Sequence, residues 1–213
     1  MPDSEQLVIY QLHIFILGIS PMIWRSVKIH SDSTIVDLHY IIQIAMGWTN
    51  SHLHCFIIHA RQYGIAQIGG ISFSDDPTKV KLSDFDWRVR EKFLYEYDFG
   101  NNWQHQIRIE AILTPKSNRI EPVCISGQGA CPPEECGGAY SFMEKKQNYC
   151  FGHIVNRFNE IIDEGDISSN IEEIYELRRW LIVDYFDRKR VNSRLKQYAK
   201  GDCESMLFEQ GIV

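Results

Sequence analysis

Three short stretches of this sequence concentrate the side chains that bind metals or move protons. They are the run His52-Leu53-His54, the segment YEYDFGNNWQHQI at 95–107 and the loop CISGQGACPPEECGG at 124–138. Imidazole, thiolate and carboxylate groups are the usual zinc ligands and the usual general acids and bases. These stretches are therefore the first candidates for a functional site.

Strand geometry decides which of the histidines can act together. Residues two apart on a strand face the same way, so His52 and His54 are expected to share a face. With His105 as a third imidazole, they would suit one zinc ion. The alternative is that each histidine is an ordinary residue at the edge of the core, which is the more common arrangement.

The segment at 95–107 alternates aromatic and polar residues on both sides of a glycine-asparagine turn. A loop of three residues, Gly100 to Asn102, would pair Tyr97 with His105 and keep the aromatic residues on one face. This register predicts that His105 lies on the aromatic face and that Asp98 points away from it.

The cysteines of the loop approach the spacing of a zinc site. Cys124, Cys131 and Cys136 follow a C-x6-C-x4-C pattern, and a fourth ligand would have to come from Cys150 or His153. Ordinary thiols in a rigid loop are the alternative interpretation. Disulfides are not expected, because no export signal is evident.

Composition limits the classes of partner. The chain has 213 residues, a net charge of -6 and 44% hydrophobic residues, which indicates a folded globule without a general affinity for phosphate backbones. A basic C-terminal segment departs from this balance, and it predicts either contact with nucleic acid or a solvated helix face. Its residues are Arg178, Arg179, Arg188, Lys189, Arg190 and Arg194.

The apolar run near the N-terminus is too short to cross a bilayer and has no basic leader or cleavage site. We therefore expect a cytoplasmic protein with no membrane partner.

Hydrophobic periodicity predicts an α+β fold. Strands are expected at 7–19, 23–29, 52–59, 93–99 and 103–113, with a helix at 35–45. The order strand-strand-helix-strand-strand-strand is typical of a β-grasp-like mixed sheet. We predict a single domain, 1–213, with a sheet core at 7–115, a Cys/Pro/Gly loop at 116–140, a helical part at 141–200 and a tail at 201–213.

Several of these motifs together resemble the plasmid ORF-three-like family, also called the passenger TnpR proteins of insertion elements. The matching segments are YQLHIFILGISPMIWR (10–25), DLHYIIQIAMGWTNSHLHCF (37–56), KLSDF (81–85), FLYEYDFGNNWQH (93–105) and CISGQGACPPEECGG (124–138). The resemblance implies a compact α+β domain found near mobile elements, with no established activity. Two positions depart from the family: Asn101 and Glu135 stand where it usually has an acidic residue and an aspartate.

The sequence contains no phosphate-binding loop, HExxH motif, nucleophile elbow or dinucleotide fingerprint. The leading hypothesis is therefore a binding or accessory protein of a plasmid or mobile element that recognises a protein or a small molecule. Its predicted binding residues are Trp24, Arg25, Trp103 and Glu134. The alternatives are a metal-dependent hydrolase, with zinc held among His52, His54, His105, Cys131 and Cys136, and a nucleic-acid-binding protein that uses the basic C-terminal segment.

Overall fold

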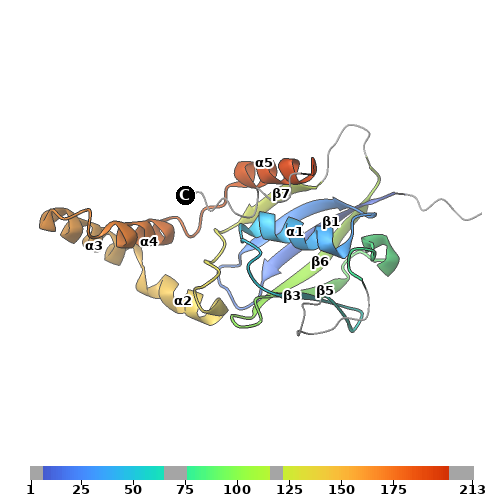
Figure 1. Ribbon diagram of the computed structural model, residues 1–213, viewed down its shortest axis with the longest axis horizontal. Helices are drawn as coiled ribbons and strands as arrows, with labels where there is room; N and C mark the ends of the chain where they lie inside the picture. Colours follow the sequence, from blue (N-terminus) through green and yellow to red (C-terminus); the bar gives the residue numbers. More distant parts are fainter. Residues whose placement is uncertain (1–6, 65–75, 116–121, 202–213) are drawn as a thin grey trace, which may run out of the picture.

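The computed structural model describes residues 7–64, 76–115 and 122–201. These residues form an antiparallel sheet with helices on one side of it and beyond one edge (Figure 1). The strands are β1 (Ile9–Ile16), β2 (Trp24–His30), β3 (His54–Ile58), β4 (Arg61–Tyr63), β5 (Lys92–Tyr97), β6 (Trp103–Leu113) and β7 (Val123–Gln128). The helices are α1 (Ile35–Met46), the short 3₁₀ helix η1 (Leu82–Phe85), α2 (Gly138–Asn148), α3 (Phe151–Glu164), α4 (Ile171–Leu181) and α5 (Arg188–Tyr198).

The strand order is β4-β3-β5-β6-β1-β2-β7, and every pairing between neighbours is antiparallel. The α+β class is confirmed, but the prediction of a mixed sheet is wrong. The hairpins β1-β2 and β5-β6 impose antiparallel pairing within each pair. The two hairpins then meet through β1 and β6, which also run in opposite directions.

Helix α1 closes the core because its sequence defines both of its ends. Thr34 forms a capping box with Asp37, and Gly47 ends the helix in the left-handed conformation that glycine adopts without steric cost. The buried residues Leu38, Ile42 and Ala45 are spaced three and four apart. This face packs on the sheet side that carries the buried alternate residues of the strands.

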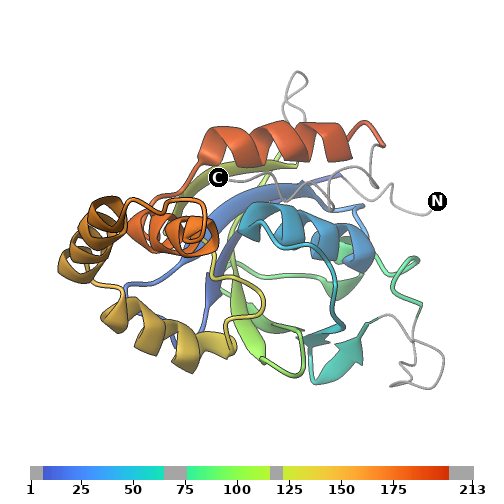
Figure 2. The same ribbon diagram turned by 60° about the vertical axis from the view of Figure 1, so that its left-hand side comes forward.

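Helix α5 packs on the outer strand β7 and also contacts α1 (Figure 2). The Asn192 side chain accepts from the backbone N–H of Cys124 and donates to the carbonyl of the same residue, both at 2.8 Å. An amide side chain thus takes the place of a further strand at this edge. Tyr198 then donates to Asp37 at 2.6 Å, which ties the end of α5 to the start of α1.

Helices α2, α3 and α4 extend to one side of the sheet (Figures 1 and 2). The buried Trp180 of α4 stacks on Tyr149 at 5.2 Å and on Phe142 of α2 at 5.5 Å, so one indole joins two helices. Arg157 of α3 binds Glu173 of α4 at 2.6 Å. Among the described residues, no helix has both the length and the apolar character needed to cross a bilayer.

Two local predictions differ from the structure, and a third is not tested by it. The segment at 116–140 contains a strand, β7, whereas we expected only a loop. The helical part expected at 141–200 begins earlier, at Gly138, and its first two helices, α2 and α3, are separated at Tyr149 and Cys150. The predicted tail lies outside the described residues, apart from Gly201.

The hairpin at 95–107 has the predicted faces but a different register. Tyr95 pairs with His105 and Tyr97 with Trp103, so the turn spans 98–102 instead of Gly100 to Asn102. His105 lies on the buried aromatic face, as predicted, because a shift of two residues preserves the side to which each residue points.

Candidate functional site

The loop that follows β7 is fixed to the core by two tryptophans. The indole N–H of Trp48 donates to the carbonyl of Pro132 at 3.0 Å, and that of Trp103 donates to the carbonyl of Glu134 at 3.2 Å. Both indoles are buried. A loop held through its backbone by buried donors has one defined conformation, so its side chains are positioned in advance.

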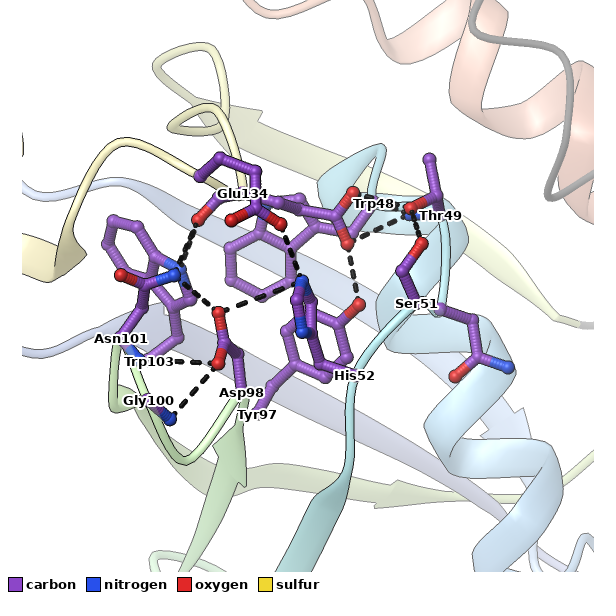
Figure 3. A network of polar contacts seen from close by, with 12 residues as sticks. Trp48, Thr49, Ser51, His52, Tyr97, Asp98, Gly100, Asn101, Trp103 and Glu134 are labelled. Atoms are coloured by element: carbon purple, nitrogen blue, oxygen red, sulfur yellow. Dashed lines mark hydrogen bonds and ion pairs between the residues drawn. The ribbon is translucent and has the colours of Figure 1, made fainter.

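The Glu134 carboxylate is surrounded by donors from two elements (Figure 3). It accepts from the backbone N–H of Thr49 at 3.1 and 3.2 Å, from the Thr49 hydroxyl at 2.6 Å and from the Tyr97 hydroxyl at 2.5 Å. Burial, and then the adjacent Glu134 carboxylate, raise the pKa of Tyr97 far above its ordinary value. Tyr97 is therefore a permanent donor, and Glu134 joins the loop to the end of α1 and to β5.

A second polar group lies beside it, around the turn of the β5-β6 hairpin (Figure 3). The buried Asp98 adopts a positive φ and accepts from the backbone N–H groups of Gly100 and Asn101 and from the Asn101 amide. His52 lies 3.8 Å from the Asp98 carboxylate and 2.8 Å from that of Glu135. Asn101 thus uses its amide as a donor to Asp98, which an acidic residue in its place would not do.

The core behind this loop contains a closed ring of hydrogen bonds. The backbone N–H of Asn50 donates to Gln43, the Gln43 amide donates to the Tyr95 hydroxyl, and His39 contacts that hydroxyl and the Asn50 side chain. The Asn50 side-chain oxygen can only accept, so His39 carries its proton on Nε2 and donates it in a hydrogen bond to Asn50. The Nδ1 of His39 then accepts a hydrogen bond from the Tyr95 hydroxyl. Every partner in the ring is satisfied while His39 is neutral.

The histidines predicted as metal ligands occupy different surroundings. His54 stacks on His39 with 3.5 Å between ring centroids, while His105 donates from Nδ1 to the backbone carbonyl of Trp103 at 3.1 Å or of Tyr95 at 3.3 Å. Burial lowers the pKa of His105 to about 4 and that of His54 to about 2. Within residues 7–64, 76–115 and 122–201, no three His, Cys, Asp or Glu side chains are arranged to hold a metal ion.

The predicted cysteine ligands are free thiols. Cys131 and Cys136 both lie in the loop after β7, and burial raises the pKa of each thiol above its ordinary value. A protonated thiol is a poor nucleophile. Cys124 lies in β7, where burial raises its pKa to about 11.

Arg25 and Trp24 are adjacent in β2 and point to opposite faces of the sheet. Trp24 packs on His13, 4.9 Å away on the outer face, and takes no part in the site. Arg25 is buried, and its guanidinium stacks on the Phe186 ring at 3.9 Å. It also donates at 2.8 to 2.9 Å to the carbonyls of Trp24, Ala45, Gln128 and Gly129.

These elements enclose a pocket of about 770 Å³. Its walls are the end of α1, the loop at 130–135, the end of α4, the segment 182–187 and one face of α5. Arg25, Cys131 and Glu134 are among the residues that line it. Arg179, Arg190 and Arg194, which we had predicted as nucleic-acid contacts, also line this pocket.

The structure therefore brings together Arg25, Trp103, Glu134 and Cys131, but it separates Trp24 from them. The sequence reasoning missed Thr49 and Tyr97, which bind Glu134, and it missed Phe186, which covers Arg25. Thr49 lies two residues after Gly47, which ends α1, and this position at the end of a helix was the only sequence feature that could have pointed to it. No sequence feature points to Phe186, because Arg25, which it contacts, is far away in the sequence.

The comparisons with known proteins agree with this architecture. The family model described as "Plasmid pRiA4b ORF-3-like protein" matches residues 8–194. The chain belongs to this family. A relative of the plasmid pRiA4b ORF-3-like protein, the uncharacterized protein y4hQ of Sinorhizobium fredii (strain NBRC 101917 / NGR234), is 31% identical over 140 residues, which are 64% of this chain and 70% of that one.

A solved structure of a similar protein also matches this member of the plasmid pRiA4b ORF-3-like family. It is the protein of unknown function MM3350 from Methanosarcina mazei Go1, with a TM-score of 0.64 and 31% sequence identity, covering 86% of this chain and 97% of that one. The resemblance inferred from the sequence motifs is confirmed. The family match spans β1 through most of α5, so it includes the residues of the site region.

Proposed function

We propose that this protein binds a small molecule in the pocket between the loop at 130–135 and helices α4 and α5. The observation that carries the proposal is the pocket of about 770 Å³, which lies in the range of typical ligand sites, roughly 300–1,000 Å³. The reference to a plasmid in the family description supports the accessory role that the sequence predicts.

The walls of the pocket are organised in advance. Arg25 donates hydrogen bonds to the carbonyl of Ala45 in α1 and to that of Gln128 in β7. Glu134 links the loop to Thr49 and Tyr97. The backbone N–H of Ala130 donates to the carbonyl of Val183 at 2.9 Å, which fixes the segment before α5. A ligand would bind with little ordering of the protein, which favours affinity.

The polar groups of the pocket favour binding over catalysis. The Glu134 carboxylate is engaged by Thr49 and Tyr97, and burial keeps the Cys131 thiol protonated. A nucleophile needs an adjacent base or a lowered pKa, and Cys131 has a raised one. Nucleic-acid binding is the weaker alternative, because half of the predicted basic residues, Arg179, Arg190 and Arg194, line the pocket.

The test is a thermal-shift screen of a metabolite panel with a variant that blocks the pocket. Ser51 is exposed and lines the pocket, so Ser51→Trp places an indole in its opening. Ser193→Trp on α5 is the matched control, since Ser193 is exposed and outside the lining. We expect ligands at a hundred times their Kd to stabilise the wild type and Ser193→Trp by about 2.7 kcal/mol and Ser51→Trp by much less.

Two results would contradict the proposal. One is a screen in which no compound raises the melting temperature of the wild type. The other is a set of hits that stabilise Ser51→Trp as strongly as Ser193→Trp, since those compounds would bind elsewhere.

A further inference from the structure

Helix α3 carries two rows of apolar side chains, and only one of them is buried. Ile154 and Ile161 are buried in the same core cluster as Trp180 of α4. In the other row, Phe151 is 72% exposed and Ile162 is 63% exposed. Because α3 lies at the outer end of the molecule, away from the sheet, this second row is open to a partner (Figure 1).

The second row has the spacing of a coiled-coil seam, and we call it the α3 seam. Its residues are Phe151, Val155, Phe158 and Ile162, of which Phe158 is half-buried and the others are exposed. Their intervals of four, three and four residues are those of the a and d positions of a heptad repeat. These intervals are the same when they are read from either end of the helix. An antiparallel copy of α3 would therefore place Phe151 against Ile162 and Val155 against Phe158, and each of these contacts would occur twice, as a twofold interface requires.

The charges of α3 favour the same antiparallel orientation. The N-terminal half of the helix contains Arg157 and no carboxylate, whereas the C-terminal half contains Glu160, Asp163 and Glu164 and no cationic residue. Arg157 already pairs with Glu160 and Glu173 within the chain, so the attraction between copies comes mainly from the helix dipole. Carboxylates near the C-terminus of a helix are unfavourable there, and they are favourable beside a helix N-terminus. An antiparallel pair places each acidic half beside the partner's N-terminal half, whereas a parallel pair would place the two acidic halves together.

The residues beside the α3 seam leave room for a second helix. Helical spacing places Gly152 and Asn159 on the side of the seam that faces away from Ile154 and Ile161, and both are exposed. A Cβ at Gly152 would meet nothing within 4 Å. Neither residue has a charge or a long side chain that a neighbouring helix would have to displace.

We propose that two copies of this chain associate through the α3 seam, with the two helices antiparallel and related by a twofold axis at the middle of the seam. The seam is smaller than a standard interface of roughly 20–30 residues per partner, so the dimer forms reversibly as the concentration rises. None of the four seam residues lines the ligand pocket, so this inference is independent of the proposed function.

The test is analytical ultracentrifugation of the full chain over a wide range of concentrations. We expect the wild type to change from monomer to dimer as its concentration rises. Phe151→Lys and Ile162→Glu each place one charge at both ends of the seam, so each should raise the dissociation constant of the dimer at least about tenfold. Both residues are mostly exposed in the monomer, so thermal melts followed by circular dichroism should show that the two variants keep their fold.

An equal mixture of the two variants tests the antiparallel pairing directly. In the mixed dimer, the introduced lysine lies opposite the introduced glutamate at one end of the seam, and Phe151 lies opposite Ile162 at the other end. The mixture should therefore dimerise more strongly than either variant alone. In a parallel pair, each introduced charge would lie opposite an apolar residue, and mixing would restore nothing.

The control is Val89→Lys, which changes an apolar residue that is 51% exposed in the segment between η1 and β5. This variant should dimerise as the wild type does. Three results would overturn the inference: a wild type that stays monomeric at every concentration, a dimer that Phe151→Lys and Ile162→Glu weaken no more than Val89→Lys does, and a mixture that does not recover the dimer. The first would leave the seam to a different protein, the second would place the contact on another surface, and the third would exclude the antiparallel pairing.

Discussion

Glu134 was predicted as a binding residue, and its contacts show that it also supports the loop that carries it. Its carboxylate accepts three kinds of donor: the Thr49 backbone N–H, the Thr49 hydroxyl and the Tyr97 hydroxyl. Glu134→Gln replaces one acceptor oxygen with an NH₂ group that faces these donors. We expect the free energy of unfolding to fall by about 1–3 kcal/mol, measured by urea denaturation.

The neighbouring glutamate provides the control for this prediction. Glu135 is 76% exposed in its side chain and has a contact with His52 at 2.8 Å. Exposed ion pairs contribute about 0–1 kcal/mol, so Glu135→Gln should change stability little. If the two variants lose the same stability, the donors around Glu134 are not what holds the loop.

Among the secondary-structure elements, those with local signals were predicted well. The cap residues Thr34 and Gly47 define α1, and alternation placed His105 on the buried face. The hairpin register was wrong because Asp98 takes a positive φ and begins a longer turn, which spacing alone does not reveal. Strand β7 was missed because Gly127 and the prolines after it are typical of a loop.

The pocket itself was beyond prediction for a physical reason. Its lining comes from α1, the loop after β7, α4 and α5, which meet only through long-range packing. Strand parity and helix periodicity indicate which residues share a face of one element, but they do not indicate which elements meet. Arg190 and Arg194 were therefore recognised as basic residues, but not as residues that line a pocket.

Strand β7 contains Gly127, although glycine is unfavourable inside a strand. A Cβ at Gly127 would lie 2.6 Å from the Phe186 ring and 2.9 Å from the Arg25 side chain. Gly127→Ala must therefore displace the ring from Arg25 and loosen the segment before α5. We expect a loss of about 1–3 kcal/mol in unfolding free energy, as for other overpacked sites, together with weaker ligand binding.

The control for Gly127→Ala is the same substitution where there is room. A Cβ at Gly152 in α3 meets nothing within 4 Å, and that residue is exposed. Gly152 is the second residue of α3, where alanine loses less backbone entropy than glycine on folding, so Gly152→Ala should not destabilise the protein. A Gly127→Ala variant as stable as the wild type would show that Phe186 moves at no cost, contrary to the role assigned to it.

For the whole molecule, the sheet and α1 bury imidazoles that must stay neutral. Burial lowers the pKa of His39 to about 4, of His54 to about 2 and of His105 to about 4. His39 is satisfied in the hydrogen-bonded ring only as the neutral tautomer, and the Nε2 of His105 is buried without a partner. Below pH 6.5, these three histidines therefore stay neutral in the folded protein, whereas they bind protons in the unfolded chain.

This difference predicts acid sensitivity well above the range in which carboxylates titrate. Histidine in an unfolded chain has a pKa near 6.5, so below that pH the unfolded state binds protons that the folded state refuses, and stability falls. The loss should begin near pH 6.5 and grow by about 1.4 kcal/mol per pH unit for each histidine, until the pH reaches its folded pKa. Burial also lowers the pKa of His13, which acts in the same direction.

Urea denaturation at intervals between pH 7.5 and 5.0 measures this effect, and the slope of unfolding free energy against pH counts the protons taken up. His54→Phe keeps a ring stacked on His39 but removes one titrating group, so its slope should be smaller than that of the wild type by about one proton. Each slope compares one protein with itself at different pH values. A change in stability that the substitution causes at every pH therefore does not affect the slope. Two results would contradict this: a free energy of unfolding that does not change between pH 7 and pH 5, or equal slopes in the two proteins. Either would show that these imidazoles accept protons in the folded state and that the core does not require them to be neutral.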